Sequence, residues 1–457
     1  MSRFWRRPPE GVPERTRRRV VIHLIPYLFF LYILAFLDRV NLSVAELGMG
    51  KPPGEGGLGF SREILGFGFG LFFWGYWILE IPSTLSVLRW GARWVFVRIL
   101  ILWGICATMM GFIGLPAFSR LCASIPAFHE DPAVNQFYAL RFLLGFFEGG
   151  FFPSVIFYLS LWFRPQDRAK AIATFMAAIP LSVSLGNPTS GLLLKANWFG
   201  LPGWRWVFIL EGIAPIFAGF LTIFFLPDRP EKARWLPPEE RDWLVNTLSN
   251  EERSKRAHGA SAWLPHLGFV LLLTAVYFCL NIYTYGLLSF MPAIIKSQSG
   301  LSDTKASIVA AIPYVFALVA MLLNGRHSDR TGERPWHVAV PLTLASIGIL
   351  LVATFDGIWI LPVLIMIIAV GPFLYAHLPA FWPIPTMFLG AGAAASAIGF
   401  INMIGNLGGS VGPTVVGKAA AGQTTFAPAL WRLAPWPFLG ALLILAMAYG
   451  RKWMAKR

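Results

Sequence analysis

The chain has 457 residues, of which 56% are hydrophobic and 13% are charged, and its mean hydropathy is +0.61. Soluble proteins carry about 25% charged residues, so this composition excludes a disordered chain, a nucleic-acid-binding protein and an ordinary soluble enzyme. The charge that remains is uneven, because 38 Lys and Arg against 23 Asp and Glu leave a net charge of +15.

Long apolar runs predict the fold class. A run of about 20 apolar residues crosses a bilayer as a helix, whereas a membrane barrel needs shorter segments of alternating polarity. The first run is too long for the core of a signal peptide, so we expect it to remain in the protein. The sequence predicts an all-α membrane protein with twelve transmembrane helices, at 20–45, 64–86, 95–115, 136–161, 168–194, 204–226, 263–295, 305–324, 336–355, 358–384, 388–417 and 428–450.

The basic residues predict the orientation of these helices. Of the 38 Lys and Arg, 27 fall in, or within four residues of, the N-terminal tail, the C-terminal tail and the loops after the even-numbered spans. Basic residues remain on the cytoplasmic side, so both termini are predicted to be cytoplasmic. The basic run at 15–19 is interpreted as part of this anchor rather than as a nucleic-acid site.

A polar segment divides the chain into two halves. We predict a basic cytoplasmic tail at 1–19, a six-helix bundle at 20–226, a cytoplasmic linker at 227–262, a second six-helix bundle at 263–450 and a tail at 451–457. Within the linker, an amphipathic stretch begins at Pro237 and Pro238. It predicts a helix that lies along the membrane surface, with a partner-binding helix as the alternative.

The two halves share a loop motif. After the eighth span the motif contains Gly325, Asp329, Arg330, Gly332 and Arg334; after the second span, Arg89, Gly91 and Arg93 keep its second part, and Leu88 stands in place of the aspartate. Glycine permits the tight turn, and the arginines can pair with the aspartate. The motif resembles the signature of the major facilitator superfamily, which implies two pseudo-symmetric bundles with a site between them.

Four charged residues lie inside predicted spans. Asp38 and Arg39 end the first span, and the fourth span carries Arg141 and Glu148. The last two are seven residues apart, so they share a helix face and differ in depth by about 10 Å. Because the two spans run in opposite directions, Asp38, Arg39 and Arg141 are predicted to lie at similar depth.

Such residues are costly in a membrane and indicate function. An arginine binds both oxygens of a carboxylate. The protonation of a buried acid depends on burial and on nearby cations. The four residues therefore favour anion uptake coupled to protons, and the alternative is a static cluster that locks two helices together.

Several further segments resemble the anion:cation symporter family of this superfamily. They are 38–41, 80–83, 91–93, 141–153, 204–212, 381–385 and 402–409. The resemblance implies that Asp38 and Glu148 are the protonatable pair and that Arg39 binds the substrate carboxylate. It also implies that Arg141 is the charged partner that holds or releases Glu148.

The same resemblance implies which residues line the central cavity. Tyr76, Trp382 and Asn406 match polar or aromatic cavity positions, and Tyr285 begins a Tyr-Gly element that the family shares. Asn402 lies one turn before Asn406, on the same helix face. For Tyr76 and Trp382, packing in the core is the alternative.

The remaining charges are interpreted as structural. We expect Glu80 to pair with Arg89 or Arg93, and Arg205 to pair with Glu211.

Three other features stand apart from these charges. His377 lies among prolines and is interpreted as a hydrogen-bonding residue at a helix break, with a second proton site or a substrate contact as alternatives. The loop 116–135 has no assigned role. Asn187-Pro188 does not match the Gly-Pro motif of drug/proton antiporters, which disfavours drug efflux.

The resemblance implies a transporter of the bacterial inner membrane, not an enzyme. It would import a small organic anion, such as a sugar acid, a tartrate-like hydroxy acid or another carboxylate, by proton symport through alternating access. Its partners would be the substrate, protons and the lipid bilayer, as a monomer, with no cofactor or metal. The alternatives are an anion exchanger, a sodium-coupled carrier and a carboxylate sensor that does not transport.

Overall fold

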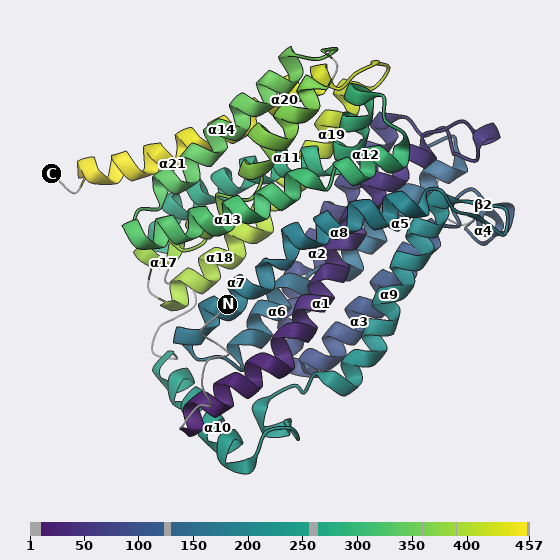
Figure 1. Cartoon of the computed structure of the whole chain (residues 1–457). Coiled ribbons are helices and arrows are strands. Elements are labelled where there is room, and N and C mark those ends of the chain that lie inside the picture. Colours follow the sequence, from purple (N-terminus) through teal and green to yellow (C-terminus); the bar gives the residue numbers. More distant parts are fainter. Residues whose placement is uncertain (1–10, 123–128, 256–263, 359, 390, 455–457) are drawn as a thin grey trace.

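The computed structural model describes residues 11–122, 129–255, 264–358, 360–389 and 391–454. Helices dominate it and lie in two groups, one on each side of a central interface (Figure 1). The predicted helical class is confirmed. The predicted segments 1–10, 123–128, 256–262 and 455–457 lie outside the described residues.

The N-terminal half contains α1 to α9 and a short hairpin. Its elements are α1 (Val12–Met49), α2 (Arg62–Trp90), α3 (Ala92–Met110), α4 (Pro116–Leu121), α5 (Pro132–Glu148), α6 (Phe151–Ser160), α7 (Pro165–Met176), α8 (Ala178–Leu193), β1 (Asn197–Trp198), β2 (Leu201–Pro202) and α9 (Gly203–Phe225). The two strands pair antiparallel, with Trp198 opposite Leu201.

The linker helix and the C-terminal half follow. They comprise α10 (Pro238–Lys255), α11 (Leu267–Ser299), α12 (Asp303–Val309), α13 (Ile312–Thr331), α14 (Pro335–Thr354), α15 (Leu361–Ile365), α16 (Leu378–Phe381), α17 (Ile384–Phe388), α18 (Ala391–Gly405), α19 (Gly408–Ala420), α20 (Ala427–Leu433) and α21 (Pro435–Met454). Between α15 and α16 the chain forms a wide turn at Met366–Val370 and a tighter one at Gly371–Phe373.

Eleven helical segments within the described ranges are long and apolar enough to cross a membrane. They correspond to eleven of the twelve predicted spans. The remaining span, 388–417, is divided at Asn406 and Leu407 into α18 and α19. The first helix also begins earlier than predicted, at Val12, so residues 12–19 of the predicted tail are helical.

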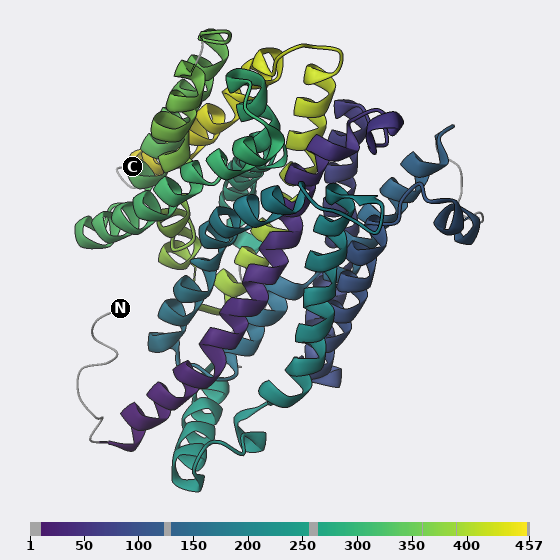
Figure 2. The same ribbon diagram turned by 45° about the vertical axis from the view of Figure 1, so that its right-hand side comes forward.

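The predicted linker helix forms and packs against α1. Arg15 approaches Glu239 at 3.5 Å, and Arg19 approaches Glu240 at 3.3 Å. Leu244 of α10 is buried. These contacts hold α10 at the end of the N-terminal half where α1 begins (Figure 2). Its position on the membrane surface remains a prediction.

The two halves pack most tightly at the end away from α10. A Cβ atom on Gly66 of α2 would lie 2.5 Å from the Pro413 oxygen of α19, and one on Gly417 would lie 2.4 Å from the Arg62 oxygen. These backbones can approach closely only because the glycines have no side chain. Asp303 also binds Lys51 of the other half at 2.7 Å. We call this end the closed end.

Candidate functional site

A break between two helices positions the first functional carboxylate. The chain turns between α5 and α6 at Gly149 and Gly150, and Gly150 has φ of +87°. A Cβ atom on Gly150 would lie 2.4 Å from the Ser83 Cβ atom of α2. Glycine is therefore required there for both backbone conformation and space, and the turn leaves Glu148 at the end of α5 inside the protein.

Arg39 and Glu148 form a buried ion pair. The Arg39 Nη2 and Nε atoms donate to Glu148 Oε1 at 2.6 and 3.1 Å. The Glu148 side chain is fully buried and that of Arg39 is 12% exposed. The second carboxylate oxygen, Oε2, is buried without a hydrogen-bond partner. A charge-assisted pair of this kind is strong, and it weakens when Glu148 loses its charge.

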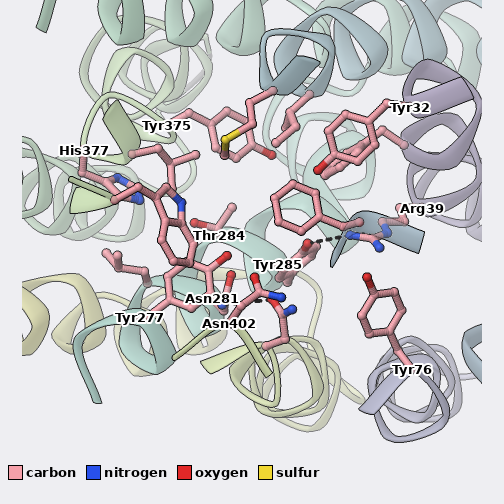
Figure 3. Close-up of a pocket in the computed structure, with 18 residues that line it drawn as sticks. Tyr32, Arg39, Tyr76, Tyr277, Asn281, Thr284, Tyr285, Tyr375, His377 and Asn402 are labelled. Atoms are coloured by element: carbon pink, nitrogen blue, oxygen red, sulfur yellow. Dashed lines mark hydrogen bonds between the residues drawn. The ribbon is translucent and has the colours of Figure 1, made fainter. Parts of the chain in front are cut away.

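Arg39 also bridges the two halves. Its Nη1 atom donates to the Tyr285 hydroxyl of α11 at 3.1 Å (Figure 3). The rings of Phe36, Phe72 and Tyr76 lie 5.0 to 5.3 Å from its Cζ atom. Aromatic faces attract a cation, so they hold the guanidinium at the interface between the halves.

Arg141 does not form the ion pair with Glu148, which is made by Arg39, and its role in holding or releasing that acid stays a prediction. Arg141 is only 2% exposed and its Nε atom donates to the Gly68 oxygen at 3.3 Å. Its Nη1 atom is buried without a hydrogen-bond partner. The sequence could place the two arginines at similar depth but could not tell which one faces the fourth span's glutamate.

Asp38 lies inside the N-terminal half rather than at the cavity. It is 2% exposed, and its Oδ1 atom accepts a hydrogen bond from Asn41 at 3.0 Å. Its Oδ2 atom is buried without a hydrogen-bond partner. A carboxylate in this state is costly when charged, which is the environment expected of a group that binds a proton.

A cavity lies between the halves. Arg39 is the only Lys or Arg among the described residues that line it. Besides the arginines, five residues were predicted to line the cavity, and all five do: Tyr76, Tyr285, Trp382, Asn402 and Asn406. The N-terminal half thus contributes the charge, whereas the C-terminal half contributes mainly neutral polar groups.

The sequence analysis missed other polar residues of the cavity wall. They are Tyr32, Tyr277, Asn281, Thr284 and Tyr375. Three of them, Tyr277, Asn281 and Thr284, recur at helical spacing along α11. A polar stripe at this spacing in an apolar span was a signal that could have identified them.

His377 also lines the cavity and is 1% exposed. Its Nδ1 atom lies 3.3 Å from the Tyr283 hydroxyl, which also bonds the backbone oxygens of Phe373 and Leu374. These contacts agree with a hydrogen-bonding residue at a helix break. A substrate contact or a second proton site there remains a prediction.

The expected pairing of Glu80 with Arg89 or Arg93 is wrong. Glu80 instead accepts a hydrogen bond from Asn402 of the opposite half, with 2.6 Å between Oε1 and Nδ2. Arg93 bonds the Leu226 oxygen through its Nε atom at 2.7 Å. The sequence could not reveal the contact with Asn402 because the two residues are 322 positions apart.

The expected pair of Arg205 and Glu211 is also absent. Arg205 donates to the backbone oxygens of Gly111 and Ile113 at 2.9 and 2.7 Å. Glu211 accepts from the Ser190 hydroxyl at 2.6 Å. Both side chains lie on α9, but each bonds a different neighbouring helix or loop.

The loop motif forms a compact turn in each half. Asp329 binds Arg334 at 2.7 Å, and Gly332 ends α13 with φ of +68°. Gly325 packs on Pro379, where a Cβ atom would lie 2.9 Å from the Pro379 Cβ atom. Arg330 lies on the exposed last turn of α13.

In the first half, Gly91 has φ of +85° and Arg89 is exposed. Asp228, from the segment after α9, accepts from the Arg93 backbone nitrogen at 3.0 Å. Asp228 therefore places a carboxylate at this turn, where Leu88 occupies the motif's aspartate position.

Two helical halves around a central cavity form an architecture suited to a membrane transport protein. Residues 28–413 match the family described as Major Facilitator Superfamily, so the chain belongs to this superfamily. The predicted superfamily is thereby confirmed, and the protein is a multi-pass membrane transporter.

Bacterial relatives cover nearly the whole chain. A protein of Agrobacterium vitis named "Putative tartrate transporter" is 41% identical over 437 residues, which are 95% of this chain and 91% of that protein. The inner membrane transport protein RhmT of Escherichia coli (strain K12) is 35% identical over 432 residues, 94% of each chain. These similarities are consistent with the predicted anion:cation symporter branch.

Solved structures agree with the fold. A D-xylose–proton symporter has a TM-score of 0.68 at 16% identity and covers 93% of this chain and 96% of its own. A bacterial homologue of the lysosomal transporter Spinster, in an inward-facing and unoccupied conformation, has a TM-score of 0.70 at 16% identity, covering 96% and 98%. At these identities the likeness concerns the fold alone.

Proposed function

We propose that this protein imports a small organic anion together with protons across the bacterial inner membrane by alternating access. The substrate would be a sugar acid, a tartrate-like hydroxy acid or another carboxylate. One observation carries the proposal: Arg39 faces the cavity while its guanidinium is paired with a buried acid, Glu148. A substrate carboxylate and Glu148 therefore compete for one cation.

Proton coupling follows from this competition. When Glu148 binds a proton it loses its charge, and Arg39 becomes free to bind the substrate carboxylate through its planar guanidinium. Asp38, buried with an unpartnered oxygen, would be the second proton site. Any ligand changes the conformational equilibrium only through its different affinity for the two states.

The cavity wall supports a substrate that carries hydroxyl groups. Facing Arg39, the C-terminal half presents Asn281, Thr284, Asn402 and Asn406, whose amides and hydroxyl can donate and accept hydrogen bonds. A site lined in this way disfavours a ligand that leaves those groups unpaired. The names of the tartrate-transporter relatives point to the same class of compound.

We also propose that both termini are cytoplasmic, from the distribution of basic residues. The closed end would then face the outside, and the end that carries α10 would face the cytoplasm. The functional unit would be a monomer.

Uptake into proteoliposomes tests the proposal. Purified protein would be reconstituted and offered labelled tartrate isomers, sugar acids, dicarboxylates and aromatic carboxylates, with and without an imposed pH gradient. We expect accumulation of at least one hydroxylated acid only when the outside is acidic. Equal uptake without the gradient would indicate an exchanger, dependence on sodium would indicate a sodium-coupled carrier, and saturable binding without uptake would indicate a sensor.

A further inference from the structure

Glu80 is a buried acid that the cycle above does not use. Its residue is 3% exposed, and its Oε1 atom accepts from Asn402 Nδ2 at 2.6 Å. Its other oxygen, Oε2, is buried without a hydrogen-bond partner. One oxygen of the carboxyl group therefore joins the two halves, and the other has no group to stabilise a negative charge.

No cation in the described part of the chain forms an ion pair with Glu80. Arg39 lies near enough to act on it, but its guanidinium bonds Glu148. Arg98 of α3 donates to the Ser83 hydroxyl at 2.6 Å, one turn further along α2. The remaining titratable groups that face Glu80 are the neutral phenols of Tyr76 on α2 and Tyr277 on α11. A buried carboxylate without a partner is costly when ionised.

The hydrogen bond between Glu80 and Asn402 lies to one side of the cavity. Helix α2 runs from Arg62, at the closed end, toward Trp90, and Glu80 lies 18 residues after Arg62, which is about 27 Å along the helix axis. It follows the cavity residue Tyr76 by one turn. The hydrogen bond to Asn402 therefore joins the halves on the α10 side of the cavity, the side that must separate for the cavity to open there.

We propose that Glu80 is a further proton-binding site, and that proton binding there weakens the Glu80–Asn402 hydrogen bond and favours separation of the halves at the α10 end. This inference rests on the proposed proton symport. A proton from cavity water adds to Oε2, forming one O–H bond, while Oε1 remains the acceptor for Asn402. A proton fits this site because it needs no space beyond that of the buried oxygen.

The charge of the acceptor controls the contact. An ionised carboxylate accepts a stronger hydrogen bond than a neutral carboxyl group. Loss of the proton to the cytoplasm restores the stronger bond and draws the halves together at the α10 end. Release of the proton thus promotes closure of the empty transporter at the α10 end. This closure precedes the reopening of the cavity to the outside.

Distances between spin labels test this without a substrate. Labels on Lys170→Cys of α7 and Arg326→Cys of α13 report the separation at the α10 end, since both positions are exposed on opposite halves. Cys122, the half-buried native cysteine, is replaced by serine. The protein is measured in lipid nanodiscs at about pH 5 and about pH 8, a range over which perturbed acids titrate.

The measurement is made in an Asp38→Asn/Glu148→Gln background, which removes the two other proposed proton sites. We expect the ratio of separated to closed populations to rise by about fivefold at the lower pH, the difference between a charge-assisted and a neutral hydrogen bond. Adding Glu80→Gln, which keeps the acceptor oxygen and mimics the protonated group, abolishes the response and fixes the separated ratio. Adding Glu46→Gln, another buried glutamate outside the cavity lining, leaves the response intact.

The outcomes separate this inference from the function itself. A background protein without a pH response, or a response that survives Glu80→Gln, overturns the role of Glu80. Proteoliposome uptake of the unmodified protein is measured in parallel. If proton-driven uptake is intact but the label distances show no role for Glu80, only the inference about Glu80 is refuted and the proposed function is not. Size-exclusion profiles test whether each variant is folded. If Glu80→Gln is misfolded, Glu80→Asp is measured in its place, and because it keeps an acid we expect the pH response to persist.

Discussion

The substitution Glu148→Gln isolates the charge of the carboxylate that Arg39 holds. Glutamine keeps an oxygen in the position of Oε1, which accepts both arginine hydrogen bonds at 2.6 and 3.1 Å. It cannot gain or lose a proton. One pH unit across the membrane supplies about 1.4 kcal/mol per coupled proton, or about a tenfold gradient of substrate. We expect the accumulation driven by one pH unit to fall about tenfold in this variant.

The same change should strengthen substrate binding at neutral pH. In the native protein the substrate carboxylate must displace a charged partner from Arg39, whereas in the variant it displaces a neutral amide. Hydrogen bonds to charged groups are stronger by roughly 1 kcal/mol than those between neutral groups, so affinity should rise about fivefold. Titration of the purified protein with the best substrate from the uptake panel measures this.

Counterflow provides the decisive comparison. Exchange of labelled for unlabelled substrate needs no net proton movement, so it should persist in Glu148→Gln while accumulation declines. Glu46→Gln serves as the matched control, because Glu46 is a buried glutamate on α1 outside the cavity lining. Undiminished gradient-driven accumulation in Glu148→Gln would refute the assignment of Glu148 as a coupling site.

Three further changes test other parts of the structure. Arg39→Lys removes the planar fork that binds two carboxylate oxygens and should weaken substrate binding roughly tenfold or more, measured by titration. Gly150→Ala places a side chain at positive φ and against α2, and should lower stability by about 2 kcal/mol in a thermal-unfolding assay; Gly399→Ala, with no neighbour within 4 Å of its Cβ position, should be nearly neutral. Asp303→Asn weakens the bond to Lys51 at the closed end, and since partly exposed pairs contribute at most about 1 kcal/mol, spin labels there should show up to a fivefold rise in open molecules.

Each of these three predictions has a contrary result. Unchanged affinity in Arg39→Lys would mean that the substrate carboxylate binds elsewhere. Equal stability of the two glycine variants would contradict the steric argument at Gly150. An unaltered label distance in Asp303→Asn would show that the bond between Asp303 and Lys51 does not hold the closed end.

The sequence alone determined the class of protein and the position of nearly every transmembrane helix. Hydropathy acts locally, because each span must satisfy its own backbone hydrogen bonds in the bilayer. Eleven predicted spans therefore match segments that are long and apolar enough to cross a membrane, including the one that turns at Gly149 and Gly150. Span 388–417 is instead divided where two glycines follow Asn406 and Leu407. The cavity residues Tyr76 and Tyr285 were also identified from the sequence through a family resemblance, and Asn402 through its helical spacing from Asn406.

Only the tertiary structure decided which charged groups meet. Arg39, not Arg141, holds Glu148, and Glu80 bonds Asn402 across the interface rather than an arginine near it in the sequence. Hydropathy and helical spacing place a side chain in depth and on a helix face. The partner of that side chain depends on how neighbouring helices are rotated and packed, and this is fixed by contacts between residues far apart in the chain.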